Sequence, residues 1–206
     1  TRMARRIARD LSHAGVTIVS GLAWGIDSAA HRGAVVAKAR TVAVLGSGVD
    51  VIYPSDHLML ADEILANGGS IVSEYQPGAS PLRHHFPARN RIISGMSEGI
   101  LLVEAARKSG AMGTVNFAME QGREVLALPG QADSPLSAST HALVRDGARL
   151  VTCAEDIHAD MGWLVAAGED RGKTGYVTQT LPFTQREQQV YNLLAGGPVD
   201  TDALVA

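Results

Sequence analysis

Two histidines and two arginines surround a proline in the stretch HHFPARNRIISG, residues 84–95, which runs on into an apolar, helix-like segment. The whole chain has a formal charge of −3, so this gathering of cations is a local patch and any anion site must be local too. Arg89 and Arg91 offer guanidinium donors, and exposed amides at a helix start attract anions as well. The stretch therefore predicts half of an anion-binding cleft, and we interpret the anion as the backbone of single-stranded nucleic acid.

Glycine-rich turns follow four apolar runs and could supply the rest of the cleft. The stretches are SGLAWGIDSAAH (20–31), GSGVDVIYPSDH (46–57), RKSGAMGT (107–114) and EVLALPGQADSP (124–135). Glycine allows a positive φ and a close approach to a ligand, and free amides at a helix start can hold phosphates. One glycine pair alone is typical of an ordinary turn without a ligand. Four such turns, together with Lys108 and the arginines, favour a site for a polyanion.

Other kinds of chemistry have weaker support. The turn at 46–48 lacks the third glycine and the later acidic residue of a dinucleotide fingerprint, so we expect no cofactor. His84 and His85 have no cysteine or carboxylate at metal-ligand spacing, so we expect no metal site. The Gly-x-Ser-x-Gly elbow of hydrolases is missing, and we expect no catalytic residues. Glu104 could be a catalytic carboxylate, although the favoured interpretation is an acceptor that holds its loop in shape.

Arginines recur at helical spacing in the first segment, at Arg2, Arg5, Arg6 and Arg9. Such a row is usually a solvated helix face. Contact with DNA or with another protein is the less favoured alternative.

The elements that must position these residues alternate along the chain. Nearly continuous apolar runs, typical of strands buried on both faces, predict strands at 16–20, 41–46, 70–74, 99–105, 124–130 and 148–152. Helical patterns lie at 2–14, 26–38, 55–67, 87–95, 112–121 and 136–145. This order predicts an α/β fold with a doubly wound, mostly parallel, Rossmann-like sheet. In such sheets ligands bind outside the carboxyl ends of the strands.

The length and composition of the chain limit how many domains it can contain. A chain of 206 residues has room for one substantial core, which we expect over residues 1–161. A Gly-rich, aperiodic stretch at 162–182 predicts a linker, and 183–206 predicts the start of a small winged-helix-like module. The chain has one cysteine, Cys153, which points to a reducing cytoplasm. It shows no apolar run of membrane-spanning length, and we expect no membrane contact.

The order of several stretches resembles one family. SGLAWGIDSAAH, TVAVLGSGVDVIYPSDH, SEYQPGASPLRHHFPARNRIISGMSEGILLVEA, RKSGAMGTVNFAMEQGREVLALPG and DGARLV follow one another as in the DNA-processing protein A (DprA, or Smf) family. The resemblance covers about residues 1–153, and its FPxRNRxIxG and REVxAxPG segments are the most specific. It implies an extended Rossmann-like fold that binds single-stranded DNA in a basic pocket and recruits the RecA recombinase during natural transformation. It also implies a homodimer and no catalytic activity.

The resemblance also implies a set of DNA-binding residues by position. Many members have a basic residue where this chain has Trp24, which could instead stack on a base for about 1–3 kcal/mol. Members usually begin with a strand and a loop ending in arginine, so we expect part of the cleft to lie outside this sequence. With Trp24 added for this stacking, the predicted DNA-binding residues are Ser20, Gly21, Trp24, Gly46, Ser47, Gly48, Arg89, Asn90, Arg91, Lys108, Ser109 and Gly110.

Two alternatives stay open. The same architecture hosts phosphoribohydrolase-like enzymes that process nucleotides, but their Pro-Gly-Gly-x-Gly-Thr-x-x-Glu motif is missing, and after Gly113-Thr114 no acid follows until Glu120. A sensor of small nucleotides could use the same backbone amides. An enzyme should release base from a nucleoside monophosphate, and a sensor should exchange an oligonucleotide for a mononucleotide.

Overall fold

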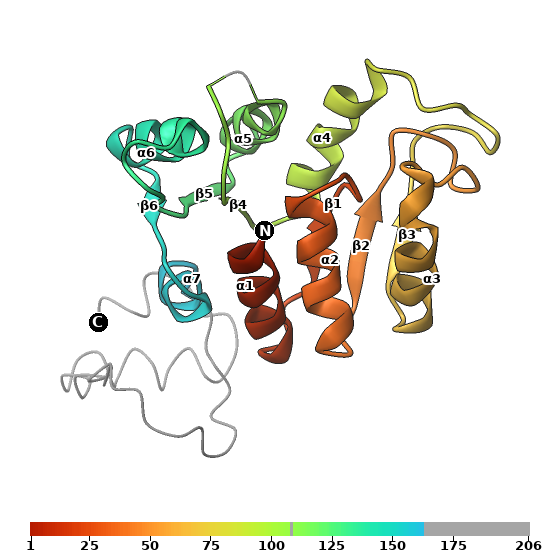
Figure 1. Cartoon of the computed structure of the whole chain (residues 1–206), viewed down its shortest axis with the longest axis horizontal. Helices are drawn as coiled ribbons and strands as arrows, with labels where there is room; N and C mark the ends of the chain where they lie inside the picture. Colours follow the sequence, from red (N-terminus) through yellow and green to blue (C-terminus); the bar gives the residue numbers. More distant parts are fainter. Residues whose placement is uncertain (108, 163–206) are drawn as a thin grey trace, which may run out of the picture. The chain divides into compact units, whose positions relative to one another are not determined.

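The computed structural model describes residues 1–107 and 109–162. The expected linker beyond residue 162 and the expected winged-helix-like module at 183–206 lie outside the described residues, as does Lys108. Helices and strands alternate almost throughout (Figure 1). In chain order they are α1 (Arg2–His13), β1 (Ile18–Ser20), α2 (Ile26–Val36), β2 (Thr41–Val44), η1 (Ser55–His57), α3 (Leu58–Ala66), β3 (Ser70–Val72), α4 (His85–Gly95), β4 (Gly99–Leu102), α5 (Ala111–Glu120), β5 (Glu124–Ala127), η2 (Pro135–Ser137), α6 (Ala138–Arg145), β6 (Arg149–Leu150) and α7 (Ala154–Asp160).

All six expected strands are present and all their pairings are parallel. Hydrogen bonds divide them into two three-stranded sheets with the orders β1-β2-β3 and β4-β5-β6. These orders correspond to the two halves of the 3-2-1-4-5-6 arrangement of doubly wound folds. The sequence predicted a single sheet, because strand hydrophobicity reports burial and does not reveal which neighbour a strand pairs with. The α/β, Rossmann-like, parallel character of the prediction is confirmed.

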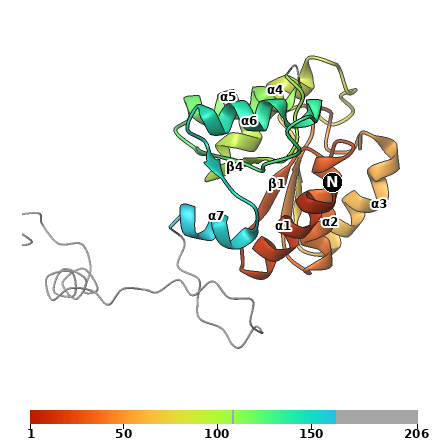
Figure 2. The ribbon, with the colours of Figure 1, turned by 60° about the vertical axis from the view of Figure 1, so that its left-hand side comes forward.

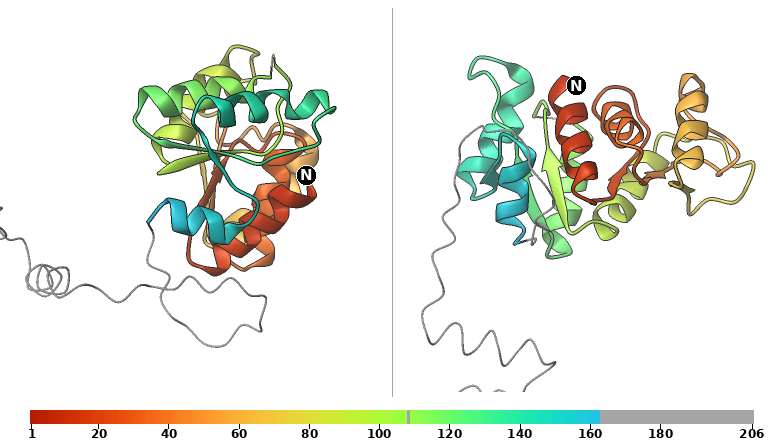
Figure 3. Two further views of the ribbon diagram at one scale, coloured as in Figure 1. Left: turned by 90° about the vertical axis from the view of Figure 1, so that its left-hand side faces the viewer. Right: turned by 90° about the horizontal axis from the view of Figure 1, so that it is seen from below.

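One apolar cluster joins the two halves. Ile7 and Leu11 of α1 pack together with Leu126 of β5, Val151 and Ile157 of α7, and all five side chains are at most 7% exposed. Two further clusters lie within the separate halves. The helices form two layers, with α1, α2, α3 and α7 on one side of the strands and α4, α5 and α6 on the other (Figures 2 and 3). Both faces of the strands are therefore covered, which explains their continuous apolar sequence.

Helix ends follow local rules where glycine supplies the required conformation. Gly68 and Gly122 lie just after α3 and α5 with φ of 73° and 65°, as expected for glycines that end helices. The expected helix at 55–67 is a 3₁₀ turn followed by α3, and Ser55 does not cap it with its side chain.

Gly33 of α2 lies so close to α1 that a Cβ there would come within 2.4 Å of the Arg5 carbonyl oxygen. The α1–α2 contact thus depends on the absence of a side chain at this position.

Candidate nucleic-acid interface

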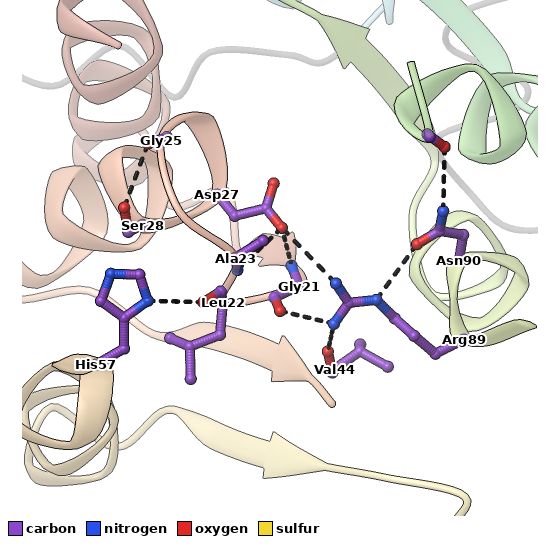
Figure 4. A network of polar contacts seen from close by, with 11 residues as sticks. Gly21, Leu22, Ala23, Gly25, Asp27, Ser28, Val44, His57, Arg89 and Asn90 are labelled. Atoms are coloured by element: carbon purple, nitrogen blue, oxygen red, sulfur yellow. Dashed lines mark hydrogen bonds and ion pairs between the residues drawn. The ribbon is translucent and has the colours of Figure 1, made fainter. Parts of the chain in front are cut away.

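Three consecutive residues of α4 connect it to three different parts of the fold. Arg89 contacts the ends of β1 and β2, Asn90 contacts the turn before α5, and Arg91 contacts Glu74 after β3. Because successive residues of a helix point about 100° apart, one turn of α4 reaches all three. Figure 4 shows the Arg89 and Asn90 side chains in contact with each other, with Arg89 reaching on to Gly21 and Val44 and Asn90 to the turn before α5.

The Arg89 side chain is buried, with 5% of it exposed. Its Nη1 donates to the carbonyl oxygens of Gly21, at 2.6 Å, and of Val44. Nη2 lies 3.9 Å from a carboxylate oxygen of Asp27. Burial lowers the pKa of Arg89, and the neighbouring Asp27 raises it; an arginine nevertheless stays charged at neutral pH. In this conformation Arg89 holds the ends of β1 and β2 together, and its guanidinium does not face solvent.

The loop after β1 already binds an anionic side chain of the chain itself. The Asp27 carboxylate accepts hydrogen bonds from the amides of Gly21, at 3.1 Å, and Ala23, at 3.3 Å. From the sequence, we predicted that the amides of this loop donate to phosphate. In the structure two of them are instead occupied by a side chain from the first turn of α2 (Figure 4). Gly21 is needed for packing, since a Cβ there would lie 2.1 Å from Nη2 of Arg89.

The loop after β2 is likewise satisfied from within. The Ser47 side chain is buried, and its hydroxyl donates to the Val51 carbonyl at 2.6 Å. The amide of Gly48 donates to the Ala79 carbonyl at 2.9 Å. His85 Nδ1 donates to the Gly46 carbonyl at 3.0 Å. This loop is held against α4 and the segment after β3, so its glycines serve close packing as well as the turn.

The turn before α5 is the most open of the three. Asn90 Nδ2 donates to the Gly110 carbonyl at 3.4 Å, while Asn90 Oδ1 accepts from Arg89 Nε at 3.3 Å. Gly110 is exposed, and a Cβ there would meet no atom within 4 Å. Ser109 is half-buried and its hydroxyl accepts from the amide of Ala111. The Asn90 side chain thus links Arg89 to this turn.

Together these contacts bring three predicted loops to one edge. We call this edge the rim and define it as residues 20–25, 45–48 and 109–110. Two of its loops follow β1 and β2 directly, and the third precedes α5 after β4, so the rim lies at the carboxyl ends of parallel strands. The structure therefore brings together the predicted residues of these loops with Arg89 and Asn90. Arg91 lies beside them and pairs with Glu74, and its side chain is 52% exposed.

Aromatic and basic side chains lie on the rim and in the segment that leads from β3 into α4. The Trp24 residue is 62% exposed, and its ring lies 4.6 Å from the ring of His57, centroid to centroid. Tyr75 stacks on His85 with centroids 3.8 Å apart and 20° between the planes. Arg83 is exposed, and in the described part of the chain it has no carboxylate partner. Sequence reasoning did not single out Tyr75 or Arg83, although Arg83 directly precedes the two histidines of the stretch that first suggested a site.

Two negative findings concern the described residues alone. No group of three or more histidine, cysteine, aspartate or glutamate side chains among them could hold a metal ion. None of their helices is long and apolar enough to cross a membrane.

Comparisons with known proteins agree on one family. The model of the DNA recombination-mediator protein A family matches residues 1–162. The Escherichia coli protein Smf is 46% identical over 173 residues, which is 82% of this chain and 46% of that protein. The chain thus spans about half the length of the curated relatives it matches.

Solved structures of the same family are similar in fold. DNA processing protein A from Streptococcus pneumoniae has a TM-score of 0.71 at 44% identity, over 77% of this chain and 55% of that one. DNA processing protein A from Helicobacter pylori, whose structure concerns its mode of single-stranded DNA binding, has a TM-score of 0.68 at 27% identity, over 77% and 71%. The match of the family model to most of the chain, together with these relatives, shows that the chain belongs to the DNA recombination-mediator protein A (DprA/Smf) family.

Proposed function

We propose that this chain binds single-stranded DNA along the rim, with little preference for sequence. The observation that carries the proposal is that Arg89 and Asn90 of α4 hold the three loops at one edge of the fold. The open turn of Ser109 and Gly110, with the exposed cations beside this edge, would present donors to successive phosphates. The Helicobacter pylori relative, which binds single-stranded DNA, supports the same ligand for this chain.

The predicted DNA-binding residues have two distinct roles in this proposal. Arg91, Lys108, Asn90 and the turn of Ser109 and Gly110 contact phosphates, joined by Arg83. The remaining members, Arg89, Ser20, Gly21, Gly46, Ser47 and Gly48, shape the edge, because their donors and surfaces are largely used within the fold. Trp24 stacks on a base, and a stacking contact is tolerant of sequence because every base has a π-face.

The position of the first acid in α5 favours a strand-binding protein over the phosphoribohydrolase-like alternative. Glu120 is the first acid after Gly113-Thr114, and it ends α5 while the rim turn precedes that helix. Nine steps of 1.5 Å put it about 14 Å along the helix from Ala111. A carboxylate at this distance cannot act on a ligand held at the turn.

Fluorescence anisotropy with labelled oligothymidylate over a salt series tests the proposal. Arg91→Ala and Lys108→Ala should each weaken binding, and each lost phosphate contact should make the slope of log affinity against log salt shallower by about 0.7. Arg145→Ala is the matched control, because Arg145 is exposed at the end of α6, away from the rim. Equal affinity in the wild type, Arg91→Ala and Lys108→Ala would exclude these two side chains from the DNA site.

Two further measurements separate the alternatives. Affinity that grows with oligonucleotide length, without competition by micromolar mononucleotide, indicates a strand binder. Competition at that concentration would indicate a nucleotide sensor, and release of base from a nucleoside monophosphate would indicate an enzyme.

We also propose that the bound strand is passed to the RecA recombinase during DNA uptake, that the protein acts as a homodimer, and that it works in the cytoplasm. Membership of the family supports these proposals. RecA assembly on single-stranded DNA should begin sooner when the chain is present, and Arg91→Ala should reduce the effect. Sedimentation would detect the dimer, and a monomer at every concentration that supports RecA assembly would contradict it.

A further inference from the structure

The outer face of α1 is strongly basic. Arg2, Arg5, Arg6 and Arg9 are all exposed, while Ala4, Ile7, Ala8 and Leu11 on the opposite face are buried. Four arginines and one acid, Asp10, therefore share this face, in a chain whose formal charge is −3. We call these four residues the arginine face. The excess of about three positive charges is local and needs a partner or solvent to balance it.

The charges on this face are only partly compensated. Asp10 lies 2.8 Å from Arg9 Nη2 and 3.8 Å from Arg6 Nε, so a single carboxylate serves two arginines. Arg2 and Arg5 form no ion pair with any other described residue. Exposed pairs of this kind contribute at most about 1 kcal/mol, so Arg6 and Arg9 could exchange Asp10 for a phosphate at little cost.

The position of α1 connects the arginine face to the rim. Residues 14–17 lead from the end of α1 into β1, which ends at Ser20 in the rim. Since α1 runs opposite to β1, its first turn lies towards the same edge as the rim. Figures 1 and 3 show α1 and α2 side by side along the strands. The close contact at Gly33 and the burial of Ile7 fix α1 in this place, so its side chains leave from a rigid support.

The chemistry of the face indicates a phosphate backbone rather than a protein surface. All four cations are arginines, whose guanidinium groups bind phosphate in a bidentate manner. No large hydrophobic residue is exposed on α1, whereas the centre of a protein interface is usually apolar and aromatic. We propose that the arginine face binds the phosphates of a single strand that continues beyond the rim, and so lengthens the DNA site down the outside of α1. This inference rests on the proposed function of the rim.

Two oligothymidylates, one of about six and one of about thirty nucleotides, distinguish the two parts of the site. The test variant is Arg2→Gln/Arg5→Gln/Arg6→Gln. The control is Lys38→Gln/Arg40→Gln/Arg145→Gln, which removes the same charge from exposed positions at the amino ends of strands. Both variants should keep the unfolding midpoint of the wild type, because the changed side chains are exposed.

The test variant should bind the long oligonucleotide at least about tenfold more weakly at low salt, with a salt slope shallower by about 2, as expected for three lost phosphate contacts. Its affinity for the short oligonucleotide should stay within about twofold of the wild type. The control should bind both oligonucleotides like the wild type, apart from a small effect of net charge that both variants share.

Other outcomes have definite meanings. If the test variant and the control bind the long oligonucleotide equally, the arginine face does not touch DNA and the inference is overturned while the rim proposal stands. The same holds if the wild type binds both lengths equally, or if the test variant loses affinity for both lengths alike. If the wild type binds neither length, the proposed function itself fails.

Discussion

The guanidinium group of Arg89 lies directly against Gly21, whose carbonyl oxygen accepts a hydrogen bond from Nη1 at 2.6 Å. The two residues are 68 positions apart in the sequence, and their contact joins α4 to the end of β1. Any side chain at position 21 would occupy the space of the guanidinium. Arg89 therefore needs glycine at position 21, and the end of β1 at Gly21 needs Arg89 to hold it in place.

Gly21→Ala should lower the free energy of unfolding by about 1–3 kcal/mol, the usual cost of overpacking. The new Cβ would lie 2.1 Å from Nη2 of Arg89 and would push the guanidinium off its carbonyl acceptors. Urea unfolding measures the change. Gly110→Ala is the matched control, because it adds the same methyl group where no atom lies within 4 Å. Equal losses in the two variants would show that the contact with Arg89 is not the cause.

Arg89→Ala should destabilise the fold by about 2–6 kcal/mol, because it leaves two buried carbonyl groups without their donor, at about 1–3 kcal/mol for each. Those groups are the carbonyls of Gly21 and Val44, while the Asp27 carboxylate loses its ion pair but keeps the amide donors of Gly21 and Ala23. Arg91→Ala, two residues further on, should cost less than about 1 kcal/mol, since its pair with Glu74 is exposed. Chemical denaturation compares the two, and similar losses would contradict the separation of structural from DNA-contacting roles.

Glu74→Gln should strengthen binding of single-stranded DNA. The Glu74 carboxylate pairs with Arg91, so its removal frees that guanidinium and takes a negative charge away from the proposed DNA path. The gain should reach about 1 kcal/mol at low salt, the upper range for an exposed pair. It should shrink as salt rises. Anisotropy titrations at two ionic strengths measure it, and unchanged or weaker binding would argue against Arg91 as a phosphate ligand.

Trp24→Ala should weaken DNA binding by about 1–3 kcal/mol and leave the free energy of unfolding nearly unchanged, because the ring is largely exposed. Trp24→Phe should retain part of the affinity, since a smaller ring still stacks. Quenching of Trp24 fluorescence by oligonucleotide offers a direct signal, although the chain has a second tryptophan, Trp163, so the Trp24→Phe spectrum must be subtracted. If alanine and wild type bind alike, no base stacks at this position.

Buried His31 should make the protein less stable in mild acid. Its Nδ1 donates to Thr41 Oγ1, because the Thr41 hydroxyl itself donates to the Ile18 carbonyl. Burial lowers the pKa of His31 from 6.5 to about 4, against the opposing effect of Asp27. The unfolded chain therefore binds the proton first as the pH falls below about 6.5, and stability is lost progressively down to about pH 4.

The loss due to His31 should approach about 3 kcal/mol, at 1.36 kcal/mol for each pH unit between the two pKa values. His31→Gln should have a lower stability at neutral pH but a flatter profile between pH 6.5 and 4. Denaturant unfolding at several pH values gives both profiles. Parallel profiles would mean that His31 does not titrate in this range.

The sequence alone predicted much of the fold, because the signals that determine it are local. Apolar runs located all six strands, and the helices predicted to end at residues 67 and 121 end within one residue of those positions. The division into two sheets was not predictable, since pairing depends on contacts between distant segments. The short helix α7 was also missed, because its seven residues offer less than two turns of pattern.

The sequence predicted that three loops share one edge, but it did not predict how their side chains are arranged. The loops after β1 and β2 and before α5 do lie at one edge, as their positions after parallel strands indicated. Which way a side chain points was not predictable. Arg89 and Arg91 look equivalent in the sequence, yet one is 4% exposed and holds carbonyl groups while the other faces solvent. Asp27 gave no sequence signal that its carboxylate would occupy the amides of Gly21 and Ala23.

The three adjacent attachments of α4 make its register unusually strict. One residue inserted just before Arg89 would turn everything behind it by about 100°. The contact of Arg89 with the ends of β1 and β2, the Asn90 hydrogen bond to Gly110 and the Arg91 ion pair with Glu74 would then be lost together. An insertion or deletion in this helix should therefore disturb the fold far more than a substitution. A natural relative with one residue more or fewer here must have a differently arranged rim.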